Sequence, residues 1–170
     1  MALERRKRQS NREGGEGRER SEFDQKVVEV KRVTRVMAGG KRMRFRALVV
    51  IGDKKGRVGL GLKKGMDVSG SVEKAVNAAK KSLISLPLVN ETIPHMLKVK
   101  YKSSVLSLMP AKPGTGVIAG GAVRSVMELA GVKNIVSKML GSNNKVNNVK
   151  AVFEAFKQMK SKAEIKRMRK

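Results

Sequence analysis

The sequence predicts an α+β protein made of two small domains, and three observations support this. Strand patterns followed by an amphipathic helix fill the first half, two prolines bracket a polar segment at 87–95, and a second series of strands and helices follows. A chain of 170 residues can form two such domains, each with a modest core. We therefore expect domains at 23–87 and 92–159, a disordered arm at 1–22 and a basic tail at 160–170.

The arm mixes Arg, Glu, Gly and Ser with almost no apolar residue, so it cannot bury enough surface to offset its ordering entropy. Its arginines either lie along phosphates when a partner is present or have no such role, and composition does not choose between the two.

The first domain opens with a hairpin pattern. "KVVEVKRVTRVMAG" alternates valines with basic residues, with one slip in the period of two, and the paired glycines of the turn 38–41 suit a tight loop. The return strand, 42–53, alternates Arg42, Arg44 and Arg46 with apolar residues. The pattern predicts a row of guanidinium groups near one end of the sheet.

A third strand and a helix complete the first domain. The strand, 57–64, carries Gly59 and Gly61, which permit a bulge or a close approach. The helical pattern covers 71–86, with Ser71 as its N-cap. Its apolar stripe, expected to cover the three-stranded sheet, comprises Val72, Ala75, Val76, Ala79 and Leu83. Its opposite face carries Lys74, Lys80 and Lys81.

The second domain shows strand patterns and helical patterns in mixed order. We expect strands at 96–104, 105–110 and 134–140, and helices at 122–130 and 147–159.

Charge is the strongest functional signal. The chain has 39 Lys+Arg against 14 Asp+Glu, a formal net charge of +25, which repels itself unless a polyanion neutralises it. This predicts a nucleic acid partner. Membrane binding is disfavoured, because the chain has no Trp and 3% aromatic residues and no apolar run long enough to span a bilayer. The N-terminus lacks the apolar core of a signal peptide, so we do not expect export.

The composition also argues against an enzyme or a metalloprotein. With no cysteine, the chain has no disulfide, no zinc knuckle and no thiol nucleophile. Its only histidine is His95, for which a structural or surface role is favoured over a catalytic one. We expect no metal and no cofactor.

The stretch "PGTGVIAGGAVRSVMELAGV" resembles a nucleotide loop but lacks its chemistry. A P-loop needs a lysine after its last glycine, where this chain has Ala122, and the glycine spacing is wrong for a dinucleotide fold. What remains is a bend that opens a helix with Arg124 in its first turn. Such a helix start favours an anion, whereas the glycines alone would serve close packing, and both interpretations stay open.

Basic residues concentrate at the two turns of the first domain, from where side chains reach furthest toward a partner. The few aromatic residues disfavour reading of single strands by stacking, and neither a zinc finger nor a helix-turn-helix pattern is present. A small sheet with a lysine-bearing helix suits backbone recognition of folded RNA. The alternatives are a protein that compacts DNA and an enzyme that acts on phosphate substrates through the glycine stretch.

Two segments carry a resemblance to a known family. "MAGGKRMRFRALVVIGDKKGRVGLGLKKGMDV" and "PGTGVIAGGAVRSVMELAGVKNIVSKMLGSNNKVNNVKAVFEAF" resemble the two domains of the S-five family of small ribosomal subunit proteins, bacterial type, over about 23–159. The resemblance implies a first domain similar to a double-stranded-RNA-binding fold. It also implies a second domain with a left-handed βαβ crossover, against the usual right-handed preference.

In function, the resemblance implies a structural, non-enzymatic constituent of the small subunit, in the cytoplasm or an organelle. Its implied partners are ribosomal RNA and the neighbouring proteins S-four and S-eight, with messenger RNA nearby and no membrane or small-molecule substrate. Family members lie near messenger entry and the head-body neck, and the family is associated with decoding accuracy.

The resemblance also assigns residues. The family's glycine hairpin, linked to spectinomycin action, falls on Gly39, Gly40, Lys41 and Arg42, and Lys64 matches a family lysine. Together with the basic residues of the first domain, these positions give the candidate RNA-binding residues, which are Arg35, Gly39, Gly40, Lys41, Arg42, Arg44, Arg46, Lys54, Lys55, Arg57, Lys63 and Lys64.

Gly116 and Arg124 match family positions at the contact with protein S-four, and are the candidate protein-contact residues. The chain departs from the family at Lys63, where a third glycine is common, and at 67–70, where a Glu-Val-Pro run is common.

Overall fold

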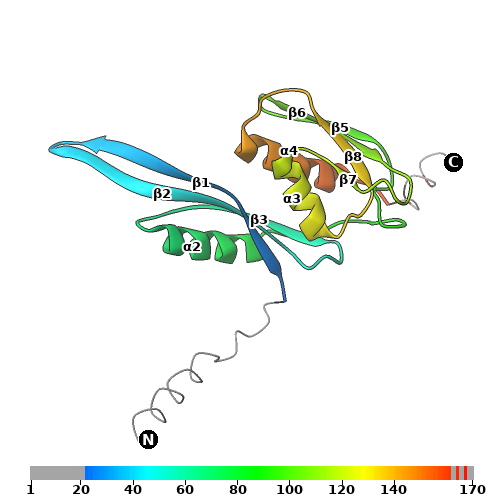
Figure 1. Cartoon of the computed structure of the whole chain (residues 1–170), viewed down its shortest axis with the longest axis horizontal. Helices are drawn as coiled ribbons and strands as arrows, with labels where there is room; N and C mark the ends of the chain where they lie inside the picture. The colour runs from blue at the N-terminus through cyan, green and yellow to red at the C-terminus, as the bar shows by residue number, and fades with distance from the viewer. Residues whose placement is uncertain (1–21, 162–163, 165–166, 168–170) are drawn as a thin grey trace, which may run out of the picture.

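A computed structural model of the chain describes residues 22–161, 164 and 167 (Figure 1). The predicted arm lies outside these residues except for Glu22, and so does most of the predicted tail. The described part forms two sheets, each with its own helices, which confirms the predicted α+β class. No helix in that part is long and apolar enough to cross a membrane.

The first sheet is antiparallel, in the order β1-β2-β3-β4, with one helix on it. Its elements are β1 (Asp24–Met37), β2 (Gly40–Gly52), β3 (Arg57–Gly65), α2 (Val68–Lys80) and β4 (Leu83–Ser85). Strand β1 has one register shift, between Val27 and Glu29, whereas its pairing with β2 is continuous from Val30 to Val33, where the valine alternation in the sequence slips. Because the pairing of β3 with β2 ends where Gly65 lies opposite Phe45, the far part of β1 and β2 projects as a two-stranded ribbon (Figure 1).

The predicted helix 71–86 is wrong at both ends. It starts after Asp67, and Ser71 is buried inside it with its hydroxyl donating to the Val68 carbonyl at 2.7 Å. It ends at Lys80, and Leu83–Ser85 pairs with β3 as a fourth strand instead of extending the apolar stripe. A short apolar run fits a strand as well as a helix, and the open edge of β3 decides in favour of the strand.

Helix α2 lies directly on β3, and Gly59 and Gly61, predicted to permit a bulge or a close approach, make this short distance between the two backbones possible. A Cβ at Gly61 would overlap the backbone carbonyl of Ala75, and one at Gly59 would overlap that of Ala79. Ala75 and Ala79 are fully buried against the sheet. Glycine therefore allows backbone-to-backbone packing here.

The second sheet has the order β5-β6-β8-β7, with α3 and α4 packed on one side. Its elements are β5 (Leu97–Tyr101), β6 (Ser104–Pro110), β7 (Val117–Ile118), α3 (Gly121–Ala130), β8 (Ile135–Met139) and α4 (Lys145–Gln158). Strand β7 was not predicted from the sequence; it pairs in parallel with β8 and makes β7-α3-β8 a βαβ unit. The left hand of that crossover stays a prediction.

The two units share a core. Leu48 and Val50 of β2 belong to the same buried cluster as Val123 and Val126 of α3. Helix α3 ends against the turn between β2 and β3 (Figure 1), where N–H groups of that turn satisfy the last helical carbonyls. The amide of Lys54 donates to the Leu129 carbonyl and that of Gly56 to the Ala130 carbonyl, each at 3.0 Å.

Candidate nucleic-acid interface

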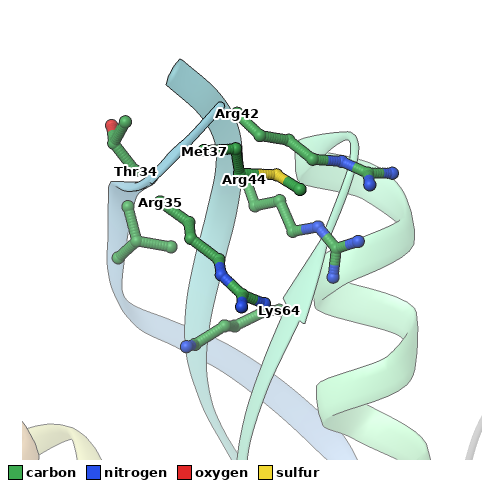
Figure 2. Close-up of a pocket in the computed structure, with 7 residues that line it drawn as sticks. Thr34, Arg35, Met37, Arg42, Arg44 and Lys64 are labelled. Atoms are coloured by element: carbon green, nitrogen blue, oxygen red, sulfur yellow. The ribbon is translucent and has the colours of Figure 1, made fainter. Parts of the chain in front are cut away.

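The basic residues of the projecting ribbon gather on one of its faces. In the strand register Arg35 lies opposite Arg42, and Arg46 lies opposite both Lys31 and Lys64. Because side chains alternate along a strand, Arg42, Arg44 and Arg46 share this face with Arg35 and Lys64. All of these except Arg46 line a hollow of about 250 Å³, which we call the hairpin groove. Its lining residues are Val33, Thr34, Arg35, Met37, Arg42, Arg44 and Lys64 (Figure 2).

The groove continues the face of β2 that packs on the second unit. Leu48 and Val50 follow Arg46 on the same face and lie in the shared core, whereas Ala47 and Val49 face α2. Helix α2 therefore covers the opposite face and leaves the groove open. Figure 2 shows the Arg35 and Lys64 side chains beside each other across it.

The groove carries uncompensated positive charge. Among the described residues, no carboxylate lies within ion-pair distance of Arg35, Arg42, Arg44 or Lys64. Guanidinium groups offer planar pairs of donors that match phosphate oxygens, and several held on one face can neutralise successive phosphates. Chemically, the groove suits a nucleic acid backbone.

The tip of the hairpin is a tight turn with open surroundings. Gly39 has φ 85° and Gly40 φ 150°, conformations in which a side chain is strained, and a Cβ at either would meet nothing within 4 Å. Lys41 lies beside the turn and is exposed. Glycine at the tip thus serves the turn and leaves the backbone accessible to a partner.

The other predicted turn lies at the far end of β2, whose 13 residues place it about 40 Å from the tip. Lys54 pairs with Asp24 at 2.6 Å, and this hydrogen bond raises the pKa of Lys54. Arg57 pairs with Asp53 at 2.7 Å and with Glu22 at 2.6 Å. These cations therefore have partners within the protein, and their distance from the tip separates them from the groove.

Two further predicted residues also lie outside the groove. Lys55 is exposed at the same far turn, where its amide donates to Asp53 at 2.8 Å. Lys63 lies opposite Ala47 and therefore points to the α2 side of the sheet. The twelve sequence candidates thus form three groups rather than one continuous surface.

The glycine stretch uses its amides internally. The N–H groups of Gly114 and Gly116 donate to the side-chain oxygen of Asn134 at 3.0 and 3.1 Å. Asn134 is 5% exposed, and Gly116 has φ 75°. These two amides are therefore not available to a phosphate, and the loop is held in a fixed shape by Asn134.

Asn134 is a residue that sequence reasoning missed. It acts 18 and 20 residues away along the chain, and no local pattern signals such an acceptor. For His95 the sequence predicts a structural or surface role, and its Nδ1 is buried without a hydrogen-bond partner in the described part of the chain. The described residues contain no group of three or more His, Asp or Glu side chains placed to hold a metal.

Comparisons with known proteins match both units. The model of ribosomal protein S5, N-terminal domain, matches residues 23–87, and that of ribosomal protein S5, C-terminal domain, matches residues 99–169. Small ribosomal subunit protein uS5 of Thermus thermophilus is 47% identical over 150 residues, covering 88% of this chain and 93% of that protein. Protein uS5c of Spinacia oleracea is 48% identical over 151 residues, covering 88% of this chain and 49% of that protein.

Proposed function

Because the chain belongs to the ribosomal protein S5 family, we propose that the hairpin groove is its principal contact with ribosomal RNA. The protein is a structural, non-enzymatic constituent of the small ribosomal subunit, where it binds ribosomal RNA and other ribosomal proteins. The observation that carries the proposal is the row of guanidinium groups on the open face of the ribbon, which form no ion pair with any carboxylate of the described residues.

The second unit, in this proposal, contacts protein neighbours through the loop between β6 and β7 and through the start of α3. Gly116 ends that loop, and Arg124 is exposed in the first turn of α3. Asn134 keeps the loop in one conformation, which lowers the ordering cost of docking. Proteins S-four and S-eight are the proposed neighbours, with messenger RNA nearby and a contribution to decoding accuracy.

The groove is tested by removing two of its guanidinium groups. We expect R42A/R44A to bind small-subunit ribosomal RNA more weakly and to lower the slope of log affinity against log salt by about 1.4 to 1.8, since each lost phosphate contact removes about 0.7 to 0.9. Folding stays intact because both side chains are exposed. Filter binding between about 50 and 200 mM salt measures the slope.

The matched control is K98A/K100A, which removes two exposed cations from β5 in the second unit. An equal loss of slope in both variants would show that net charge alone acts and would reject the groove.

Sedimentation tests the wider proposal, because a tagged chain that is absent from small-subunit particles at moderate salt contradicts it. Equal affinity for duplex DNA and ribosomal RNA would favour DNA compaction instead.

A further inference from the structure

We propose that the first unit has a second surface for RNA phosphates, on the side of the sheet opposite the hairpin groove. This surface, the α2 patch, consists of Lys63, Lys74, Asn77 and Lys81. The inference rests on the proposed function, in which ribosomal RNA already contacts the groove. It adds that a separate segment of RNA backbone binds the other side.

Consecutive lysines of β3 explain why cations appear on both sides of one sheet. Lys64 lies opposite Arg46 and lines the groove, whereas Lys63 lies opposite Ala47, on the side covered by α2. Lys63 thus reaches past the edge of the helix and joins side chains from its outer face. Together with Ala78, the four patch residues line an open hollow of about 330 Å³.

The helix supplies the rest of the patch at helical spacing. Positions 74, 77 and 81 are separated by three and four residues, and Lys81 is the C-cap of α2 with helical backbone angles, so the three side chains lie on one face. From Lys74 to Lys81 the axis rises about 10 Å, which lets the two ammonium groups contact different phosphates of one strand.

The chemistry of the patch is that of an anion site. Lys63, Lys74 and Lys81 are exposed, and none forms an ion pair with another described residue, whereas Lys26, Lys54 and Lys133 are each paired with a carboxylate. The Asn77 amide adds neutral donors. The nearest acidic side chain along the helix, Glu73, lines a neighbouring hollow with Gln25, and Asn77 borders both hollows, but Glu73 forms no ion pair with a patch lysine.

One RNA strand cannot reach both surfaces at the same point, because the sheet and the helix on it lie between them. A layer of this kind is about 10 Å thick from backbone to backbone. The groove and the α2 patch therefore hold separate backbone segments, and the domain acts as a bridge between two parts of the folded RNA.

The decisive variant is K63Q/K74Q/K81Q, with protein-free small-subunit ribosomal RNA as the probe. We expect the salt slope to fall by about 2 to 3 relative to the unchanged protein, which corresponds to three lost phosphate contacts. The control K98Q/K100Q/K138Q removes three exposed lysines from the second sheet and shows the effect of net charge alone. A slope equal to that of the unchanged protein or of the control would overturn the patch.

Hydroxyl-radical footprinting on the same RNA separates the two surfaces. We expect R42A/R44A and K63Q/K74Q/K81Q to lose protection at different nucleotides, and loss at the same nucleotides would overturn a separate second segment. If the patch variant binds RNA normally but loses a neighbouring ribosomal protein, the patch is a protein contact and the inference is wrong. If the unchanged protein itself does not bind the RNA, the proposed function fails rather than the patch alone.

Discussion

At the scale of single residues, Asp53 shows that Arg57, a cation predicted to contact RNA, already has a partner within the protein. Its side chain is 5% exposed and accepts hydrogen bonds from the amides of Lys55 and Arg57 and from the Arg57 guanidinium, at 2.8, 3.0 and 2.7 Å. The sequence located Arg57 as a turn cation but could not show its partners. One of them, Glu22, lies 35 residues away along the chain.

Asp53 also gives the fold a pH dependence with a definite sign. Burial raises the pKa of Asp53, but the hydrogen bonds from Arg57 and from the Lys55 and Arg57 amides outweigh it, and the pKa lies below its ordinary value. A carboxylate with a lowered pKa stabilises the fold above the pKa of the unfolded chain, about 3.9, and this contribution is lost as pH falls through the folded pKa.

We therefore expect the stability advantage of the unchanged protein over D53N to be constant above about pH 5 and to shrink below about pH 4. Urea unfolding across this range measures it. An advantage that persists unchanged at the acidic end would show that the ionised carboxylate does not provide it.

At the scale of elements, the packing of α2 on β3 requires glycine at the positions of β3 where a side chain would overlap the helix backbone. G61A places a Cβ into the backbone carbonyl of Ala75, so we expect it to lower the free energy of unfolding by about 2 kcal/mol or more. G70A is the matched control inside α2, where a Cβ meets nothing within 4 Å. Since alanine favours a helix, G70A should raise stability by about 0.5 kcal/mol.

Denaturant midpoints of the two variants measure the contrast. If G61A is as stable as G70A, the helix does not pack on β3 backbone to backbone. The sequence predicted both elements from periodicity and named Gly61 as a site of close approach. It could not place the end of α2, because the pairing of Leu83–Ser85 with β3 depends on an edge that exists only in the folded sheet.

At the scale of the whole molecule, the sequence predicted two sheet-and-helix units but not how they join. The row of arginines could be predicted because side chains alternate along a strand. The face of the sheet on which the row lies could not be predicted, because it is decided by α3, which packs on Leu48 and Val50. Besides the shared core, the joint includes backbone hydrogen bonds from Lys54 and Gly56 to the end of α3, which leave no sequence pattern.

The shared core predicts that the two units unfold together. Tyr101 is the only tyrosine and the chain has no tryptophan, so tyrosine fluorescence reports the second unit while far-ultraviolet circular dichroism reports both. Urea transitions followed by the two signals should coincide in the unchanged protein.

In G52A, a Cβ would overlap the Leu129 carbonyl and push α3 away from β2, so we expect a lower midpoint and two separated transitions. G121A, at the open start of α3, should leave the transitions coincident. Coincident transitions at an unchanged midpoint in G52A would mean that the units are not coupled through this contact. Coupling matters for function, because a rigid joint fixes the direction in which the ribbon and its groove project from the second unit.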